Sequence, residues 1–240
     1  MRLQIYHTVN AGLYIWNGRS GLLVDALHGG KKMGFSNTPD RYIRMMEKKE
    51  GFLGQKNDLL FTHTHEDHYD PELVDRFFKV NPDSLVYGPG LDRSNVKPLV
   101  LESGIGLIRI HDYTIYAFTT KHDGEPFAGV PHCSYLIQSC GQTLWISGDA
   151  VLEPLLADQV EEICGDSRID AAFVMVYQIG SRAGKEFLEK LSPRNSYLYH
   201  LPYKEDDEHQ YYRLVQAVTK RRQRENFLIT IPCADCFIQQ

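Results

Sequence analysis

Short apolar or alternating runs dominate the first part of the chain, and they predict β-strands. Unbroken apolar runs are typical of fully buried strands, and alternation of apolar and polar residues is typical of strands with one buried face. Such runs predict strands over residues 3–7, 13–16, 22–25, 58–62, 84–87, 107–110, 114–119, 134–138 and 143–147. Asn17-Gly18 and Cys140-Gly141 each separate two neighbouring runs, and both pairs predict tight hairpins.

Longer stretches with apolar residues three or four positions apart predict helices over residues 39–49, 71–80, 154–163, 185–191 and 206–224. Proline near the start of the first helix and Asn81-Pro82 after the second are typical helix boundaries. In the second half of the chain, helices alternate with strands predicted over 171–177, 196–200 and 226–231. Because no repeat, low-complexity tract or linker interrupts this order, the pattern predicts a single α/β domain, rich in sheet, over residues 1–240.

The composition is ordinary for a globular chain, with 42% hydrophobic and 24% charged residues among 240. A chain of this size builds a core that needs no disulfide or structural metal, so a bound metal is available for chemistry. The net charge of −5 argues against a nucleic-acid partner, because phosphate backbones are met by basic surfaces. No feature of the sequence indicates an oligomeric state.

The five cysteines are odd in number and lack the spacing of a disulfide framework. The single CxxC at residues 233–236 lacks the second pair that a four-thiolate zinc site requires. Reduced thiols fit a cytoplasmic protein. The N-terminal residues show no signal-peptide pattern, and no apolar run reaches transmembrane length, so we expect a cytoplasmic location without membrane association.

The segment 63–68, with the sequence His-Thr-His-Glu-Asp-His, carries the candidate chemistry. It follows a predicted strand directly, and on an extended chain His63 and His65 project to the same side, where they can share one ion. The chain is then expected to turn, so that Asp67 and His68 present an oxygen and a nitrogen to a second ion. Neutral imidazole suits zinc, and a nearby carboxylate lowers the cost of holding a dication. The segment therefore predicts two divalent ions, with zinc favoured over manganese.

Further candidate ligands lie at the C-terminal ends of predicted strands. Asp149 follows a glycine, which lets the backbone pass close to a ligand. His200 ends one predicted strand, and His122 comes shortly after another. A fourth residue, His132, competes with His122, because the second predicted hairpin places position 132 almost opposite Asp149.

The sequence resembles the metallo-β-lactamase-fold hydrolases over most of its length. The His-x-His-x-Asp-His segment and Ser147-Gly148-Asp149 carry the specific part of the resemblance. Asp25, at the end of an early strand, and Tyr199-His200 add to it. The resemblance implies a four-layer αββα sandwich.

The resemblance also implies a role for each candidate. One ion would be held by the histidines His63, His65 and His122. The second would be held by Asp67, His68 and His200. Asp149 would bridge the two ions. Asp25 would support the loop without binding metal. The third histidine of the family usually lies some two dozen residues before the bridging aspartate. His122 precedes it by 27 residues (149 − 122) and His132 by 17 (149 − 132), so we favour His122 and expect His132 to support the site.

Two ions held in this way would bind a shared water and lower its pKa to about 7, which provides a hydroxide at neutral pH. Asp67 and Asp149 would orient this nucleophile while holding metal, so they are the expected catalytic residues. We therefore expect hydrolysis of a small ester, lactone or phosphodiester. Residues 64–71 look closest to the ascorbate-6-phosphate-lactonase-like hydrolases.

Two alternatives stay open. A ribonuclease Z-type phosphodiesterase or nuclease would use the same ions, but the acidic net charge and the lack of room for an RNA-binding insertion argue against it. A non-catalytic metal-binding protein of the same fold would be expected to have lost ligands, whereas all seven are present in the sequence.

Overall fold

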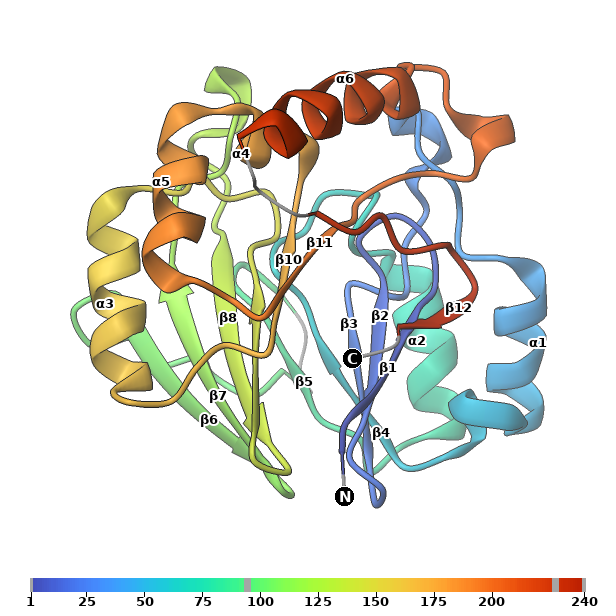
Figure 1. The fold of residues 1–240 in the computed structure, drawn as a ribbon. Helices are drawn as coiled ribbons and strands as arrows, with labels where there is room; N and C mark the ends of the chain where they lie inside the picture. Colours follow the sequence, from blue (N-terminus) through green and yellow to red (C-terminus); the bar gives the residue numbers. More distant parts are fainter. Residues whose placement is uncertain (1, 93–95, 226–228, 239–240) are drawn as a thin grey trace. The chain divides into compact units, whose positions relative to one another are not determined.

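A computed structural model describes residues 2–92, 96–225 and 229–238, and in it the chain forms two compact units (Figure 1). Unit 1 comprises Met1–Leu99, Leu201–His209 and Cys233–Gln239, and unit 2 comprises Val100–His200, Gln210–Pro232 and Gln240. Each unit combines a mixed β-sheet with helices. Both units draw on distant parts of the sequence, so neighbours within a unit can be far apart along the chain.

In the described part of unit 1, six strands form a sheet in the order β12-β1-β2-β3-β4-β5. Their bounds are β1 Gln4–His7, β2 Leu13–Trp16, β3 Gly21–Val24, β4 Asn57–Leu60, β5 Val86–Tyr87 and β12 Cys236–Ile238. The pairs from β12 to β3 are antiparallel, and β3, β4 and β5 are parallel. The predicted hairpin joins β2 to β3, and its Asn17 side-chain oxygen accepts hydrogen bonds from the N–H groups of Arg19 and Ser20.

Two α-helices of unit 1 cover one face of this sheet (Figure 1), namely α1 Asp40–Lys48 and α2 Pro71–Val80. The helix α2 begins where the Asp70 carboxylate accepts from the N–H groups of Glu72 and Leu73, which satisfies donors that the helix itself leaves open. Buried Met46 of α1 and Phe77 of α2 belong to the same core cluster as the side chains of β3 and β4. Short 3₁₀ helices complete the unit as η1 Gly30–Met33, η2 Gly51–Gly54 and η4 Lys204–Asp206.

In the described part of unit 2, six strands form a sheet in the order β11-β10-β9-β8-β7-β6. Their bounds are β6 Ile105–Ile110, β7 Tyr113–Thr119, β8 Cys133–Ser139, β9 Gln142–Ile146, β10 Ala171–Val174 and β11 Asn195–Leu198. The strands β6 to β9 are antiparallel, whereas β9, β10 and β11 are parallel. The second predicted hairpin joins β8 to β9 at Cys140 and Gly141, whose φ angles of 53° and 71° suit a two-residue turn.

The helices of unit 2 are α3 Pro154–Cys164, α4 Val176–Gly180, α5 Arg182–Leu191 and α6 Tyr211–Arg224, with the 3₁₀ helix η3 Glu125–Phe127. Phe187 of α5 packs on Trp145 of β9, with 5.4 Å between the ring centroids. Buried Arg222 of α6 donates to the carbonyl oxygens of Ile179 and Ser181, at the end of α4. Among the described residues, no helix combines the length and the apolar composition needed to span a membrane.

Several predicted elements have other bounds in the structure, and three in the second half of the chain show why. The strand predicted over 171–177 ends at Val174, because the Gln178 side chain accepts from the N–H of Met175 and so starts α4. The helix predicted over 206–224 begins only at Tyr211. Of the strand predicted over 226–231, residues 226–228 lie outside the described residues, and Thr230 forms an isolated bridge. The strand β12 was not predicted.

Candidate metal centre

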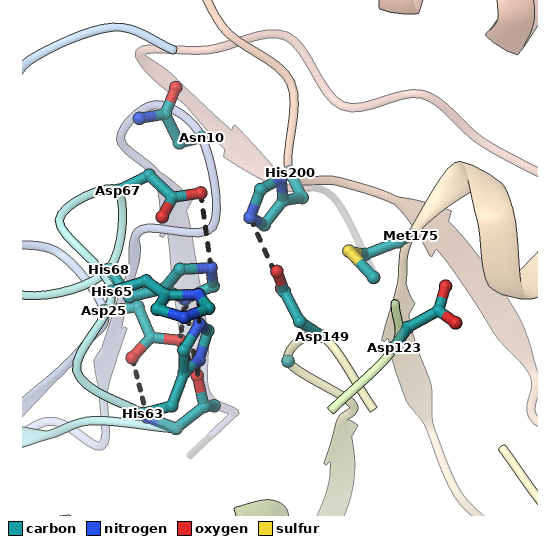
Figure 2. Close-up of polar contacts among 12 residues, drawn as sticks. Asn10, Asp25, His63, His65, Asp67, His68, Asp123, Asp149, Met175 and His200 are labelled. Carbon is teal, nitrogen blue, oxygen red and sulfur yellow. Dashed lines mark hydrogen bonds and ion pairs between the residues drawn. The ribbon is translucent and has the colours of Figure 1, made fainter. Parts of the chain in front are cut away.

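The histidine loop, residues 63–68, lies in unit 1 between β4 and α2 (Figure 2). His63 and His68 are fully buried, Asp67 is almost so, and His65 is half-buried. Nε2 of His63 lies 3.0 Å from Nδ1 of His65. Nε2 of His68 lies 3.7 Å from Oδ2 of Asp67. The four side chains therefore form two close pairs of potential ligand atoms within this loop.

Asp25 organises the histidine loop from the end of β3. Its carboxylate accepts from the N–H of Thr62 at 2.8 Å, from the hydroxyl of Thr62 at 2.7 Å and from Nδ1 of His68 at 3.0 Å. Because its hydrogen goes to Asp25, the Thr62 hydroxyl oxygen accepts from Nδ1 of His63 at 3.1 Å. In both His63 and His68, Nδ1 thus carries the proton and Nε2 carries the lone pair. Nε2 of His63 faces His65, and Nε2 of His68 faces Asp67. A histidine that ligates a metal is held by its other nitrogen in this way.

A second group of candidates lies around Asp149 in unit 2, and Figure 2 shows Asp149 and His200 of this group. One carboxylate oxygen lies 3.3 Å from Nε2 of His200, and the other lies 3.6 Å from Nε2 of His122. Nδ1 of His122 donates to the carbonyl oxygen of Asp123 at 2.5 Å, so its Nε2 carries the lone pair. A single carboxylate thus faces two different imidazoles with its two oxygens.

His132, the competitor of His122, has a different set of partners. Its Nε2 accepts from the backbone N–H of Asp149 at 3.0 Å, and its Nδ1 donates to the hydroxyl of Thr120 at 2.7 Å. The lone pair of Nε2 is therefore directed at a backbone donor. Burial raises the pKa of the neighbouring Cys133 thiol to about 12.

Left-handed backbone marks three positions of these two groups. Asp25 (φ 47°), Gly148 (φ 55°) and His200 (φ 63°) all have positive φ angles. Glycine adopts this conformation without strain, whereas other residues adopt it uncommonly, with aspartate and histidine several-fold enriched. Positive φ angles after β3 and β11 turn the chain sharply at the points where Asp25 and His200 are presented. Such outliers cluster at functional sites.

The separations within each unit fit shared metal ligands. Two atoms that bind one tetrahedral zinc ion, each at ~2.0–2.1 Å, lie about 3.3 Å apart. The four pairs measure 3.0, 3.7, 3.3 and 3.6 Å. The donors are imidazole nitrogens and carboxylate oxygens, which suit zinc and related divalent ions. On both counts the residues fit the metal that the sequence predicts.

The seven predicted ligands are thus divided between the two units. The histidine loop supplies four in unit 1, and the Asp149 group supplies three in unit 2; the residues are His63, His65, Asp67 and His68, and His122, Asp149 and His200. Sequence reasoning missed the roles of Thr62 and Gln178. Thr62 stands directly before the motif and could have been noticed, whereas no pattern in the sequence points to Gln178.

A pocket of about 580 Å³ lies in unit 1 beside the histidine loop. Among its lining residues are Glu66 of the loop, Tyr69 directly after it, and His28. The predicted ligands are not among its described lining residues. Its charged groups mix carboxylates with Lys32 and Arg76, so it has no clear preference for an anion or a cation.

No protein-family model matches the chain, and no curated protein sequence matches it. Solved structures do match. The isothiocyanate hydrolase from Delia radicum gut bacteria has 15% identity and a TM-score of 0.65, and 99% of each chain is covered. The metallo-beta-lactamase fold protein YhfI from Bacillus subtilis has 13% identity and a TM-score of 0.60, with 99% of this chain and 98% of YhfI covered.

The diiron beta-hydroxylase CmlA from Streptomyces venezuelae has 13% identity and a TM-score of 0.65 over 100% of this chain. The chain spans only about half of CmlA, 54% of its length. At 13–15% identity, the likeness of these structures to the chain shows the fold alone. The chain therefore has the metallo-β-lactamase fold, and the predicted α/β fold class is confirmed.

Proposed function

We propose that the chain is a metal-dependent hydrolase that holds two divalent ions. The first ion would be bound by His63, His65 and His122, the second by Asp67, His68 and His200, with Asp149 bridging them. The observation that carries this proposal is the position of Asp149, whose two oxygens face the imidazoles of His200 and His122 at 3.3 and 3.6 Å. A carboxylate whose two oxygens face two different imidazoles is suited to bridging two ions.

The residues of the chain have distinct tasks in this proposal. Two ions would supply a water activated at neutral pH and a Lewis acid for the developing oxyanion. Asp25 and Thr62 keep the protons on Nδ1 of His63 and His68, so that both Nε2 atoms are able to bind metal. Asp67 and Asp149 reduce the net charge of the two cations and orient the nucleophile, and they are the proposed catalytic residues.

Zinc is the proposed metal, with manganese as the second choice. Five of the seven ligands are histidines and two are aspartates. Imidazole-rich sets favour zinc, whereas manganese favours sets rich in carboxylate and water oxygens.

The proposed substrate is a small ester, lactone or phosphodiester. The proposed enzyme is a single catalytic domain that works in the cytoplasm. The fold neighbours include an enzyme named for the hydrolysis of isothiocyanates, whose central carbon is also an electrophile. The likeness of residues 64–71 to ascorbate-6-phosphate-lactonase-like hydrolases supports the lactone within this class. The five cysteines lack the spacing of a disulfide framework, which agrees with a reducing compartment.

A nuclease is the main enzymatic alternative. The short form of human tRNase Z has the same fold, with 13% identity and a TM-score of 0.58. The net charge of −5 disfavours RNA, because a polyanion binds to basic surfaces. A metal-binding protein without catalysis is the second alternative.

The test is a hydrolysis screen on zinc-loaded protein at neutral pH. The panel contains lactones, carboxylic esters, thioesters, phosphodiesters, an isothiocyanate and a precursor tRNA, with His63→Ala as the matched inactive control. We expect turnover of at least one small-molecule class that the control lacks. Turnover of RNA alone would support the nuclease, and two bound ions without any turnover would support the non-catalytic protein.

A further inference from the structure

Gln178 is a buried carboxamide in unit 2, with only 3% of its surface exposed. It lies in α4, and its side chain makes four hydrogen bonds. Its Oε1 accepts from the N–H of Met175 at 2.7 Å and from the hydroxyl of Ser147 at 2.8 Å. Its Nε2 donates to the carbonyl oxygens of Gly148 at 3.0 Å and Ala150 at 2.8 Å. Both hydrogens and both acceptor positions of the carboxamide are therefore used.

The two donated hydrogen bonds lie on either side of Asp149. The carbonyls of Gly148 and Ala150 belong to the residues directly before and after it, so one side chain fixes both ends of this short segment. The remaining backbone groups of Asp149 are also bonded, since its N–H donates to His132 at 3.0 Å and its carbonyl oxygen accepts from the N–H of Asp123 at 2.7 Å. The backbone of residues 148–150 thus has little freedom to rotate.

The orientation of the carboxamide follows from its partners. A backbone N–H can only donate, so the atom that faces Met175 must be the oxygen. The nitrogen must then face the carbonyls of Gly148 and Ala150, which can only accept. Glutamate has nearly the same shape but no hydrogen to donate there, so it would set a carboxylate oxygen against two carbonyl oxygens.

We propose that Gln178 is a positioning residue that places the Asp149 carboxylate for metal binding. This inference rests on the proposed dinuclear function. A bridging carboxylate must meet two ions at once, so a small rotation of its backbone disturbs both. The four hydrogen bonds of Gln178 go to Ser147 and to backbone groups, so it acts through the two peptide groups that flank Asp149.

The experiment compares Gln178→Glu and Gln178→Met with the wild-type protein. Gln178→Glu replaces the donor half of the carboxamide with an acceptor and adds a negative charge, and Gln178→Met removes all four hydrogen bonds without adding a charge. Gln216→Glu is the matched control, because it makes the same chemical change at an exposed position of α6. Zinc affinity is measured by competition with a chelator, and the visible spectrum of the cobalt(II)-loaded protein reports ligand geometry. Hydrogen exchange over residues 147–151 is measured on metal-free protein.

We expect zinc binding to be weaker by about 10–100-fold in both Gln178 variants, with a changed cobalt spectrum and faster exchange over residues 147–151. The control should match the wild type. Wild-type zinc affinity and an unchanged spectrum in a folded Gln178 variant would overturn the proposal. Failure of both variants to fold would also overturn it, because Gln178 would then serve the fold of unit 2.

The two proposals fail in different ways. If wild-type protein binds no zinc, the proposed function is wrong. The exchange comparison on metal-free protein then still decides whether Gln178 fixes residues 148–150, and exchange equal to that of the wild type would overturn the inference. If wild-type and both variants bind two zinc ions equally well, only the inference about Gln178 is wrong.

Discussion

The two groups of candidate ligands are held in place by different means. In unit 1, the carboxylate of Asp25 accepts hydrogen bonds from the side chains of Thr62 and His68, as well as from a backbone N–H. In unit 2, His132 accepts from the backbone N–H of Asp149, and Gln178 donates to the backbone carbonyls of the residues before and after Asp149. The first arrangement decides which ring nitrogen carries a proton, whereas the second decides where a carboxylate lies.

This difference predicts different failures. A change to the support of the histidine loop should put a proton on a nitrogen that must bind metal. A change to the support of Asp149 should leave every protonation state intact and displace one ligand. The following substitutions separate these two effects, from the largest expected effect to the smallest.

Asp149→Ala should have the largest effect, because the residue is proposed to serve both ions. We expect loss of both ions and a fall in activity of roughly 10³-fold or more, since several kcal/mol of transition-state stabilisation depend on the metals. Asp67→Ala is the comparison, and it should lose one ion. Elemental analysis of each purified variant gives the count. Full metal content in Asp149→Ala would show that Asp149 holds neither ion and remove the bridge from the account.

His122→Ala and His132→Ala should differ, although both rings lie close to Asp149. His122→Ala removes a proposed ligand, so we expect about one ion to be lost and activity to fall by ~10²-fold or more. His132→Ala removes a hydrogen bond to a backbone N–H, so both ions should stay bound with affinity reduced by about tenfold. Zinc titration of both variants decides the matter. The reverse order would make His132 the third histidine ligand.

Asp25→Asn tests the side-chain arrangement of unit 1. Asparagine keeps the size of aspartate, but its NH₂ group faces Nδ1 of His68 and makes that nitrogen an acceptor. The proton then moves to Nε2, the nitrogen proposed to bind metal, so zinc affinity should fall by about 10–100-fold. The buried Asp58→Asn is a matched control in the same unit, because Asp58 accepts from the N–H of Leu85 and is not a proposed ligand or ligand support. Equal zinc affinities in the two variants would contradict the role of Asp25.

Asp235→Asn should affect stability and leave metal binding unchanged. Asp235 accepts from the side chains of Arg41, Tyr42 and Tyr203 in unit 1. Burial opposes ionisation, but these hydrogen bonds prevail and lower the pKa of Asp235. The stabilisation is therefore present above the unfolded pKa of ~3.9 and is lost as pH falls through the lower folded value.

We expect the unfolding temperature of Asp235→Asn at pH 7 to be lower by a few degrees, from about 1 kcal/mol of lost charge-assisted hydrogen bonding. The difference from the wild type should shrink as the pH is lowered below ~4. The exposed Asp158→Asn, which removes a surface ion pair with Lys190, should change little. Thermal unfolding followed between pH 3 and 7 measures all three proteins.

The histidine loop is visible in the sequence because its candidate ligands are local. His63, His65, Asp67 and His68 follow one another within six positions, so their types and spacing are visible without a fold. The elements that flank them were found for the same reason, since α2 has the predicted bounds and β4 overlaps the strand predicted over 58–62. Asp25 was found only through the resemblance, because nothing local ties it to Thr62, which lies 37 residues away.

The support of Asp149 was harder to predict because it depends on tertiary contacts. Gln178 lies in a stretch that reads as the end of a strand, since apolar residues continue up to Tyr177. The chain instead forms α4 there, and the side chain that caps this helix also binds the carbonyls of Gly148 and Ala150. A polar side chain that bonds backbone groups leaves no periodic pattern. The strand β12 was missed because its partner β1 lies at the other end of the chain.

The most direct test of the central claim is the metal content of the wild-type protein. The protein is expressed with zinc supplied, purified without chelator and examined by elemental analysis against its measured concentration. The account predicts close to two zinc ions per chain, and close to none in Asp149→Ala prepared in parallel. Wild-type protein that is folded and holds no bound transition metal would contradict the account.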